Sequence, residues 1–110
     1  MNTFLARLSD VERRRVESGK SYREFMRMSS MSIGLYVLPV NGLDLQKPHH
    51  EDEAYYMIRG HARFKSGNED YEVSAGTMIY VEKGIEHCFH DITEPVEALV
   101  FFAPPETPAT

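Results

Sequence analysis

The sequence predicts one all-β domain, a sandwich or a barrel, preceded by one short helix. Its 110 residues are the size of a single domain with a single core. From residue 22 onward, apolar, β-branched and aromatic residues come in short alternating runs, which is typical of strands. These runs recur at roughly 8–12-residue spacing with glycine or asparagine turns between them, which is the pattern of a sandwich or barrel.

One helix is predicted near the N-terminus, within residues 9–19. Ser9 is a suitable N-cap, Asp10 lies in the first turn, and Gly19 follows the last turn. The helix is short and strongly charged, so we expect it on the surface. Residues 1–21 are therefore assigned to a helical segment outside the barrel.

Strands are predicted through most of residues 22–105. The expected strands are residues 22–28, 32–39, 54–58, 61–65, 71–76, 77–81, 86–92 and 97–105. The Asn41-Gly42 pair closes the second strand, and residues 66–70 form a hairpin loop. Two prolines end the last strand, and residues 106–110 are expected to be a disordered tail.

The stretch "KPHHEDEAYYMIRG", residues 47–60, fits two local structures. Pro48 at a first helical position, with Arg59 late and Gly60 after it, would suit a helix. Against a helix, "AYYMI" is a continuous apolar block without a 3.6-residue period, and strands are predicted on both sides of it. We therefore interpret residues 54–58 as a strand.

Charge and cysteine content argue against several partners and locations. The formal net charge is -5 and no basic tract offsets the acids, which argues against nucleic acid and acidic membranes as partners. No apolar run approaches the ~20 residues of a membrane helix, and no signal-peptide core is expected. Cys88 is the single cysteine, so an internal disulfide is not expected. These features predict a cytoplasmic protein.

Histidines and carboxylates cluster at residues 49–53, directly before an apolar run. His49 and Glu53 share a face by parity, but a straight strand would separate their Cα atoms by about 13 Å at ~3.3 Å per residue. Two ligands of one metal ion hold their donor atoms about 2.0–2.2 Å from it. A shared ion therefore requires a corner at residues 50–52, with His49 ending one strand and Glu53 beginning the next.

A second histidine comes from elsewhere in the chain. His87 follows Gly84 after a turn, at the start of a predicted strand. Two histidines and one carboxylate suit Fe(II), Mn(II), Ni(II) or Zn(II) and leave coordination positions open. His49, Glu53 and His87 are therefore the candidate ligands of a divalent metal ion.

"HHEDEAYYMIRG" followed by "GTMIYVEKGIEH" resembles the two motifs of the cupin family, G-x5-H-x-H-x3,4-E-x6-G and G-x5-P-x-G-x2-H-x3-N. Glu53 and Gly60 fit the first motif. Gly76, Gly84 and His87 fall on the second motif in register. The resemblance extends from the first predicted strand to the last. It implies a double-stranded β-helix, the cupin jelly-roll barrel, with a metal site in its cavity.

The chain departs from the cupin pattern at three motif positions. Lys47 occupies the slot of the first histidine, and shifting the frame by one residue places Gln46 or Pro48 there, which fits less well. Glu82 and Asp91 replace the proline and the asparagine of the second motif. The family's set of three histidines and one glutamate is therefore reduced to two histidines and one glutamate.

These departures leave two alternatives open. Either the three remaining ligands hold a metal ion, completed by water, His50 or Glu51, or the site has become a metal-free pocket. A Lys47 ammonium directed at a cation would oppose binding unless it turns outward or loses its proton. His50 has the wrong parity to join His49, so we expect it in solvent.

Strand parity and the resemblance suggest which side chains face the cavity. Tyr55 and Met57 share parity with Glu53, and Met78 and Tyr80 are expected to line the same interior. In some cupin lyases a tyrosine near the metal acts as general base, which makes Tyr55 the candidate catalytic residue. The alternative is that its ring fills the barrel. No residue is assigned to an organic cofactor.

The predicted function is a metal-dependent enzyme acting on a small polar molecule. Dioxygenase, isomerase and lyase chemistries all occur on the cupin fold, so the fold does not select among them. The alternative is a non-catalytic binding module, a sensor or carrier, which Lys47 and Glu82 favour. The family resemblance also implies a homodimer.

Overall fold

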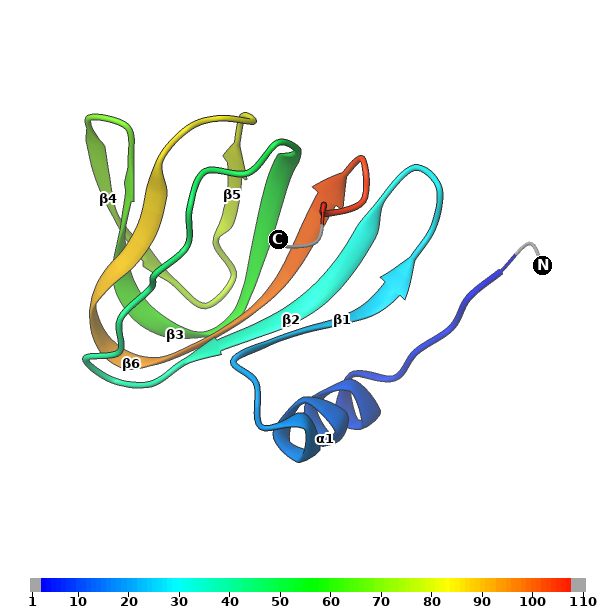
Figure 1. The fold of residues 1–110 in the computed structure, drawn as a ribbon. Coiled ribbons are helices and arrows are strands. Elements are labelled where there is room, and N and C mark those ends of the chain that lie inside the picture. Colours follow the sequence, from blue (N-terminus) through cyan, green and yellow to red (C-terminus); the bar gives the residue numbers. More distant parts are fainter. Residues whose placement is uncertain (1–2, 108–110) are drawn as a thin grey trace.

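The structure is a computed structural model that describes residues 3–107 (Figure 1). Helix α1 covers Leu8–Ser18. The strands are β1 (Tyr22–Arg27), β2 (Ser32–Leu38), β3 (Asp52–Ser66), β4 (Glu69–Ser74), β5 (Met78–Val81) and β6 (His87–Ala103). The predicted all-β class with a short N-terminal helix is confirmed.

All paired strands are antiparallel, in the order β1-β2-β6-β3-β4, and β5 pairs with the first half of β3. The second half of β3 pairs with β4. Because β3 and β6 are long and curved, each of them contributes to both walls of the barrel, as their ribbons in Figure 1 show. The stretch whose local pattern allowed a helix is therefore a strand.

The two long strands bend where Gly60 meets Pro95. Gly60 has φ +114°, and a Cβ atom placed on it would lie 2.4 Å from the Pro95 carbonyl oxygen. The pairing register of β3 and β6 shifts between Met57 and Arg63, which indicates β-bulges. Such bulges bend a pair of strands without ending their hydrogen-bonded pairing. The sequence predicted a break within each of these strands. That prediction was wrong, because the bulges preserve the pairing through the bend.

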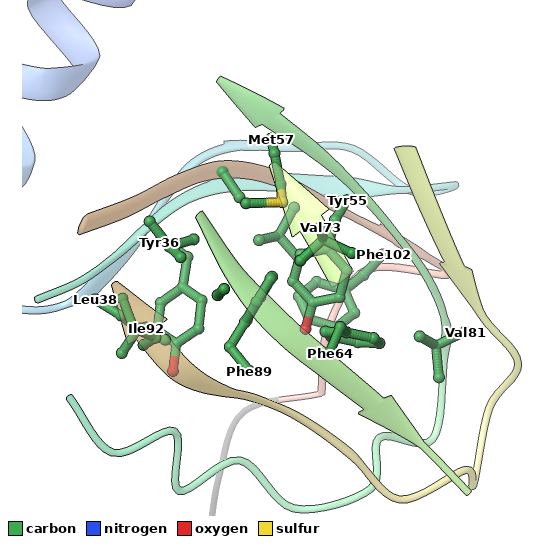
Figure 2. Packing of buried hydrophobic residues seen from close by; sticks show 14 residues of the cluster. Tyr36, Leu38, Tyr55, Met57, Phe64, Val73, Val81, Phe89, Ile92 and Phe102 are labelled. Carbon is green, nitrogen blue, oxygen red and sulfur yellow. The ribbon is translucent and has the colours of Figure 1, made fainter. Parts of the chain in front are cut away.

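Side chains from both walls fill the barrel (Figure 2). The rings of Tyr55, Phe64 and Phe89 meet edge to face, with centroids 4.9 to 5.5 Å apart. Each such pair contributes about 0.5–1.5 kcal/mol beyond the burial of its apolar area. Phe64 and Tyr55 also lie 5.9 and 6.3 Å from the ring of His87, so the core supports one of the predicted ligands.

Met78 and Tyr80 do not line the interior. Their exposed fractions are 75% and 65%, whereas Val81 is buried. Directly paired residues of adjacent strands share a face, and β5 pairs Val81 with Glu53. The odd-numbered residues of β5 therefore point inward, and the predicted cavity positions were wrong by one residue.

Helix α1 begins two residues earlier than predicted, because its N-cap is Arg7 and not Ser9. Ser9 lies inside it, and Arg7 occupies the N-cap position without a side-chain capping bond. Gly19 ends the helix with φ +71°, as predicted. Val11 is its buried residue, so the helix covers the barrel with a narrow apolar contact. Over residues 3–107, no helix has the length and apolar content needed to cross a membrane.

The C-terminal segment is ordered further than predicted. The backbone N–H of Glu106 donates to the Ser32 hydroxyl at 2.9 Å, and Arg27 donates to the Glu106 carbonyl at 3.0 Å. Thr107 donates to Glu51 through its backbone N–H at 3.1 Å. The predicted disordered tail therefore starts too early, and residues 108–110 lie outside the described residues.

Candidate metal centre

The three predicted ligands, His49, Glu53 and His87, meet at one point in the barrel. One donor atom from each lies within 4.8 Å of the other two. His87 Nε2 is 2.8 Å from Glu53 Oε1, and His49 Nε2 is 4.0 Å from the same oxygen. Donor atoms around an ion with bonds of about 2.1 Å are roughly 3.0–3.4 Å apart. The measured separations lie on both sides of this range, so shifts of the side chains by about 1 Å would let the three share one ion.

The bend of the long strands brings two of these ligands together. Glu53 pairs with Phe102 and His87 pairs with Ser66, at opposite ends of the β3–β6 ladder. The two side chains meet because the ladder folds over near Gly60, so that its ends face each other across the barrel. The candidate centre is thus a product of the barrel closure.

His49 comes from the irregular segment 39–51 that precedes β3. The predicted corner before Glu53 is present, but His49 follows irregular backbone rather than ending a strand. His50 is exposed, and the buried Glu51 carboxylate accepts hydrogen bonds from Thr107. Neither residue belongs to the cluster of donor atoms.

Both imidazoles have one nitrogen engaged away from the centre. His87 Nδ1 lies 2.8 Å from the Ile85 carbonyl oxygen, an acceptor, so Nδ1 carries the hydrogen and donates it. His49 Nδ1 lies 3.4 Å from Glu106 Oε2. In each ring the other nitrogen, Nε2, faces the centre: His87 Nε2 has no hydrogen-bond partner, and His49 Nε2 lies 3.1 Å from Gln46 Oε1. A metal-binding histidine typically holds its second nitrogen in this way.

Buried polar atoms at the centre have no hydrogen-bond partner. Both carboxylate oxygens of Glu53 and Nε2 of His87 are buried and unpaired. The 2.8 Å contact between them is close but not aligned as a hydrogen bond, and in the neutral tautomer it sets two acceptors face to face. Burying an unpaired carboxylate is costly unless a cation or donor compensates it. The residues present therefore fit a divalent metal ion.

The two histidines differ in their proton affinity. Burial lowers the pKa of His87, but the Glu53 carboxylate and the Ile85 carbonyl outweigh burial, and the pKa is raised above its ordinary value. Burial lowers the pKa of His49, an effect that the Glu53 carboxylate only partly offsets. His49 therefore gives up its proton more readily than His87, and an ion at the centre would compete with a proton for His87 Nε2.

Tyr55 lies beside the centre and within the core. It is 1% exposed, and its hydroxyl accepts a hydrogen bond from Gln46 Nε2 at 3.2 Å. Burial and the Glu53 carboxylate raise the pKa of Tyr55 well above its ordinary range. Its ring fills the barrel, the alternative that the sequence left open (Figure 2). Met57 also points inward but is packed in the core.

Two hollows lie beside the candidate ligands, one at His87 and one at His49. One, of about 500 Å³, lies beside His87 and is lined by polar side chains that include Lys65 and Asn68. The other, of about 120 Å³, lies beside His49 and includes Tyr22. The larger hollow has room for a small molecule with several polar groups, and the smaller has room for a few atoms.

Sequence reasoning missed two inward-facing residues of the segment before β3. Exposed and partly buried residues alternate from Leu43 to Lys47, so that Asp44 and Gln46 face the barrel and Lys47 faces solvent. The alternation of apolar and polar residues in the sequence could have revealed this segment as extended chain. It would have given the wrong face, however, because here the polar residues point inward and the leucines point outward. The Lys47 ammonium is thus turned away from the donor atoms.

Glu106 is a further residue that the sequence did not indicate. It lies against His49 and beside the smaller hollow. Burial, followed by the nearby carboxylates of Glu53, Glu51 and Glu24, raises the pKa of Glu106 to about 7, although Arg27 opposes the shift. The carboxyl is therefore largely protonated in the metal-free fold at mildly acidic pH.

A pH-dependent stability follows from that pKa. Because the folded pKa of Glu106 lies above its ordinary value of 4.5, its contribution is complete below pH 4.5 and is lost as the pH rises through about 7. In chelator-treated protein we expect the free energy of unfolding to fall across this range, and to fall less in Glu106→Gln. Urea unfolding at pH 5 and pH 8 measures both slopes. Parallel slopes in the two proteins would contradict the prediction.

Comparison with known proteins places this geometry in a family. The family model described as a cupin domain matches residues 34–102. The uncharacterized protein SCO3923 of Streptomyces coelicolor is 41% identical over 101 residues, which cover 92% of this chain and 96% of that protein. The region matched by the family model contains the candidate ligands and all or most of every strand except β1.

Solved structures agree with the fold. BH2720 from Bacillus halodurans has a TM-score of 0.79 at 18% identity, covering 97% of this chain and 85% of that chain. The DMSP lyase DddQ from Ruegeria pomeroyi has a TM-score of 0.64 at 21% identity, covering 69% of this chain and 39% of that chain. A protein of Methanocaldococcus jannaschii described as an RmlC-like cupin with a double-stranded β-helix has a TM-score of 0.69 at 16% identity, covering 76% of this chain and 78% of that chain. The chain has the jelly-roll barrel and belongs to the cupin domain family.

Proposed function

We propose that this protein binds one divalent metal ion, of the Fe, Mn, Ni or Zn class, through His49, Glu53 and His87. The observation that carries the proposal is the set of unpaired buried atoms, the two Glu53 oxygens and His87 Nε2. An unpaired buried carboxylate beside two imidazoles is a costly arrangement in the absence of a cation. Two nitrogen donors and one oxygen donor suit these metals.

We further propose an enzyme that acts on a small polar molecule bound in the larger hollow. A bound ion would supply Lewis acidity toward a substrate oxygen, or a site for dioxygen. Lys65 and Asn68 line the hollow and offer polar contacts that would hold the molecule beside His87. The likeness to the DMSP lyase DddQ supports lyase chemistry only through the shared fold, so dioxygenase and isomerase chemistries stay equally open.

Tyr55 is the proposed general base of such a reaction. The phenol lies close enough to feel the Glu53 charge, and its hydroxyl is held by Gln46. A base must lose its proton, and burial opposes this for Tyr55. A cation beside it would reverse part of that effect. Tyr55→Phe removes the proton-transfer group and keeps the ring in the core.

A non-catalytic binding module, a sensor or carrier, is the second candidate. The raised pKa of Tyr55 favours it, because a phenol that keeps its proton is a poor base. In this case the protein binds a small molecule in one of the hollows and does not catalyse a reaction on it.

Metal analysis of protein purified without a histidine tag separates the two candidates. Near-stoichiometric metal that is lost in His49→Ala and His87→Ala supports the metal centre. His50→Ala is the matched control, because its imidazole is exposed and should leave metal content unchanged. Metal-free protein that is stabilised by a small molecule in a thermal-shift screen would support the binding module instead.

The homodimer and the cytoplasmic location stay predictions from the family resemblance and from the composition. Sedimentation equilibrium measures the oligomeric state directly.

A further inference from the structure

Gln46 presents its side-chain oxygen to the candidate centre. Its Oε1 atom lies 3.1 Å from His49 Nε2, the nitrogen that also faces Glu53. In the metal-free fold this contact is a hydrogen bond, and its length also falls within the roughly 3.0–3.4 Å expected between neighbouring donor atoms of one ion with bonds of about 2.1 Å. Gln46 also lines both hollows, the one beside His87 and the one beside His49. Its amide oxygen thus lies next to one proposed ligand, at a distance that a shared ion allows.

A buried network fixes which end of the amide faces the centre. Gln46 Nε2 donates to Asp44 Oδ2 at 3.0 Å, and an ionised carboxylate can only accept, so that end of the amide is the nitrogen. Asp44 is held in turn by the Tyr36 hydroxyl at 2.7 Å and by the Phe89 backbone N–H at 2.8 Å. With the nitrogen held on Asp44, the oxygen is left to face His49. The acceptor is therefore oriented before any ion binds.

The backbone explains why position 46, rather than 47, faces inward. The segment from Leu43 to Lys47 alternates between exposed and partly buried residues, as an extended chain does. In this segment Asp44 and Gln46 point inward, so the inward side chains are two residues apart. His49 also points inward, although it is three residues after Gln46. The irregular backbone around Pro48 therefore interrupts the alternation of inward and outward side chains. Counting two residues back from His49, as the cupin motif does, consequently leads to Lys47, which points to solvent.

We infer that the amide oxygen of Gln46 is the fourth protein ligand of the metal centre, in place of the histidine that the first cupin motif would supply. This inference rests on the proposed metal binding. With Gln46 included, the ligand atoms of the centre are two imidazole nitrogens, one carboxylate oxygen and one neutral amide oxygen. Such a set carries one negative charge and leaves coordination positions open for a substrate.

The test uses Co(II) as the probe and its visible absorption as the reporter. In Gln46→Leu we expect the absorption bands of bound Co(II) to change, because the ion would lose one oxygen ligand. Lys47→Leu is the matched control one residue away, and we expect it to keep the wild-type spectrum because its side chain is exposed. A changed spectrum in Lys47→Leu alone, or wild-type spectra in both variants while both bind Co(II), would overturn the inference.

Titration calorimetry with Mn(II) supplies a second measurement. Gln46→Leu removes the donor at similar size, and we expect its dissociation constant to rise by about 10-fold or more, the scale of losing one well-placed partner in a metal site. Lys47→Ala should change it by less than about 2-fold, in keeping with an exposed side chain. Equal affinity in Gln46→Leu and the wild type would overturn the inference while leaving the metal centre intact. A wild-type protein that binds neither ion would overturn the proposed function as well.

Discussion

Glu53→Gln will weaken divalent-metal binding by about 10-fold or more and will leave the metal-free protein at least as stable as the wild type. The substitution removes the carboxylate charge among the proposed ligands, and charge-assisted contacts are the strong ones in a metal site. In the metal-free fold the effect has the opposite sign. The buried Glu53 oxygens are unpaired, whereas a glutamine amide can donate to His87 Nε2.

Calorimetry with Mn(II) and thermal unfolding in chelator measure the two effects of Glu53→Gln separately. Glu82→Gln is the control, because it removes the same charge from an exposed residue of the second motif and should change neither quantity. Unchanged affinity in Glu53→Gln would show that Glu53 is a structural residue of the corner before β3. A large loss of metal-free stability would show that its carboxylate has a partner other than a cation.

Gly60→Ala will destabilise the fold by about 3 kcal/mol or more. A φ of +114° is strained for any residue with a Cβ atom, which costs about 1–3 kcal/mol. The added Cβ would also meet the Pro95 carbonyl oxygen at 2.4 Å and the Val96 Cα at 2.8 Å. These contacts are backbone atoms that cannot rotate away, so overpacking adds a further cost of about 1–3 kcal/mol.

Gly67→Ala is the matched control for Gly60→Ala. It has φ +60°, and a Cβ atom there would have no neighbour within 4 Å, so only the backbone strain of about 1–2 kcal/mol is expected. Urea unfolding of both variants separates strain from the clash. Equal losses would mean that β6 moves away from Gly60 at little cost. Because the bend at Gly60 brings Glu53 to His87, Gly60→Ala should also weaken metal binding where the protein still folds.

The sequence was informative wherever a local pattern decides the structure. Alternation and turn residues predicted the strands, and the two motifs predicted which histidines and which glutamate would meet. Parity within one strand was also a sound guide, because successive side chains alternate faces. It placed Tyr55 and Met57 on the inner face with Glu53, where the structure has them.

Pairing between strands was beyond the local pattern. Whether Tyr80 or Val81 points inward depends on which of them pairs with Glu53, and that register is set by the partner strand. The bulges at Gly60 leave β3 continuous where a glycine had suggested an end. The register between two strands depends on contacts between residues far apart in the sequence, so it cannot be predicted from the residues of one strand alone.

The residue types and their order by themselves determined that this chain folds into a cupin barrel and carries two imidazoles and a carboxylate for one site. Only the tertiary structure decided that Gln46 faces the centre while Lys47 faces solvent, and that Glu106 from the chain's far end lies on His49. The physical reason is the irregular segment before β3. This segment has no ladder of hydrogen bonds, so the surfaces against which it packs decide which of its side chains point inward. Those surfaces are formed by other parts of the barrel.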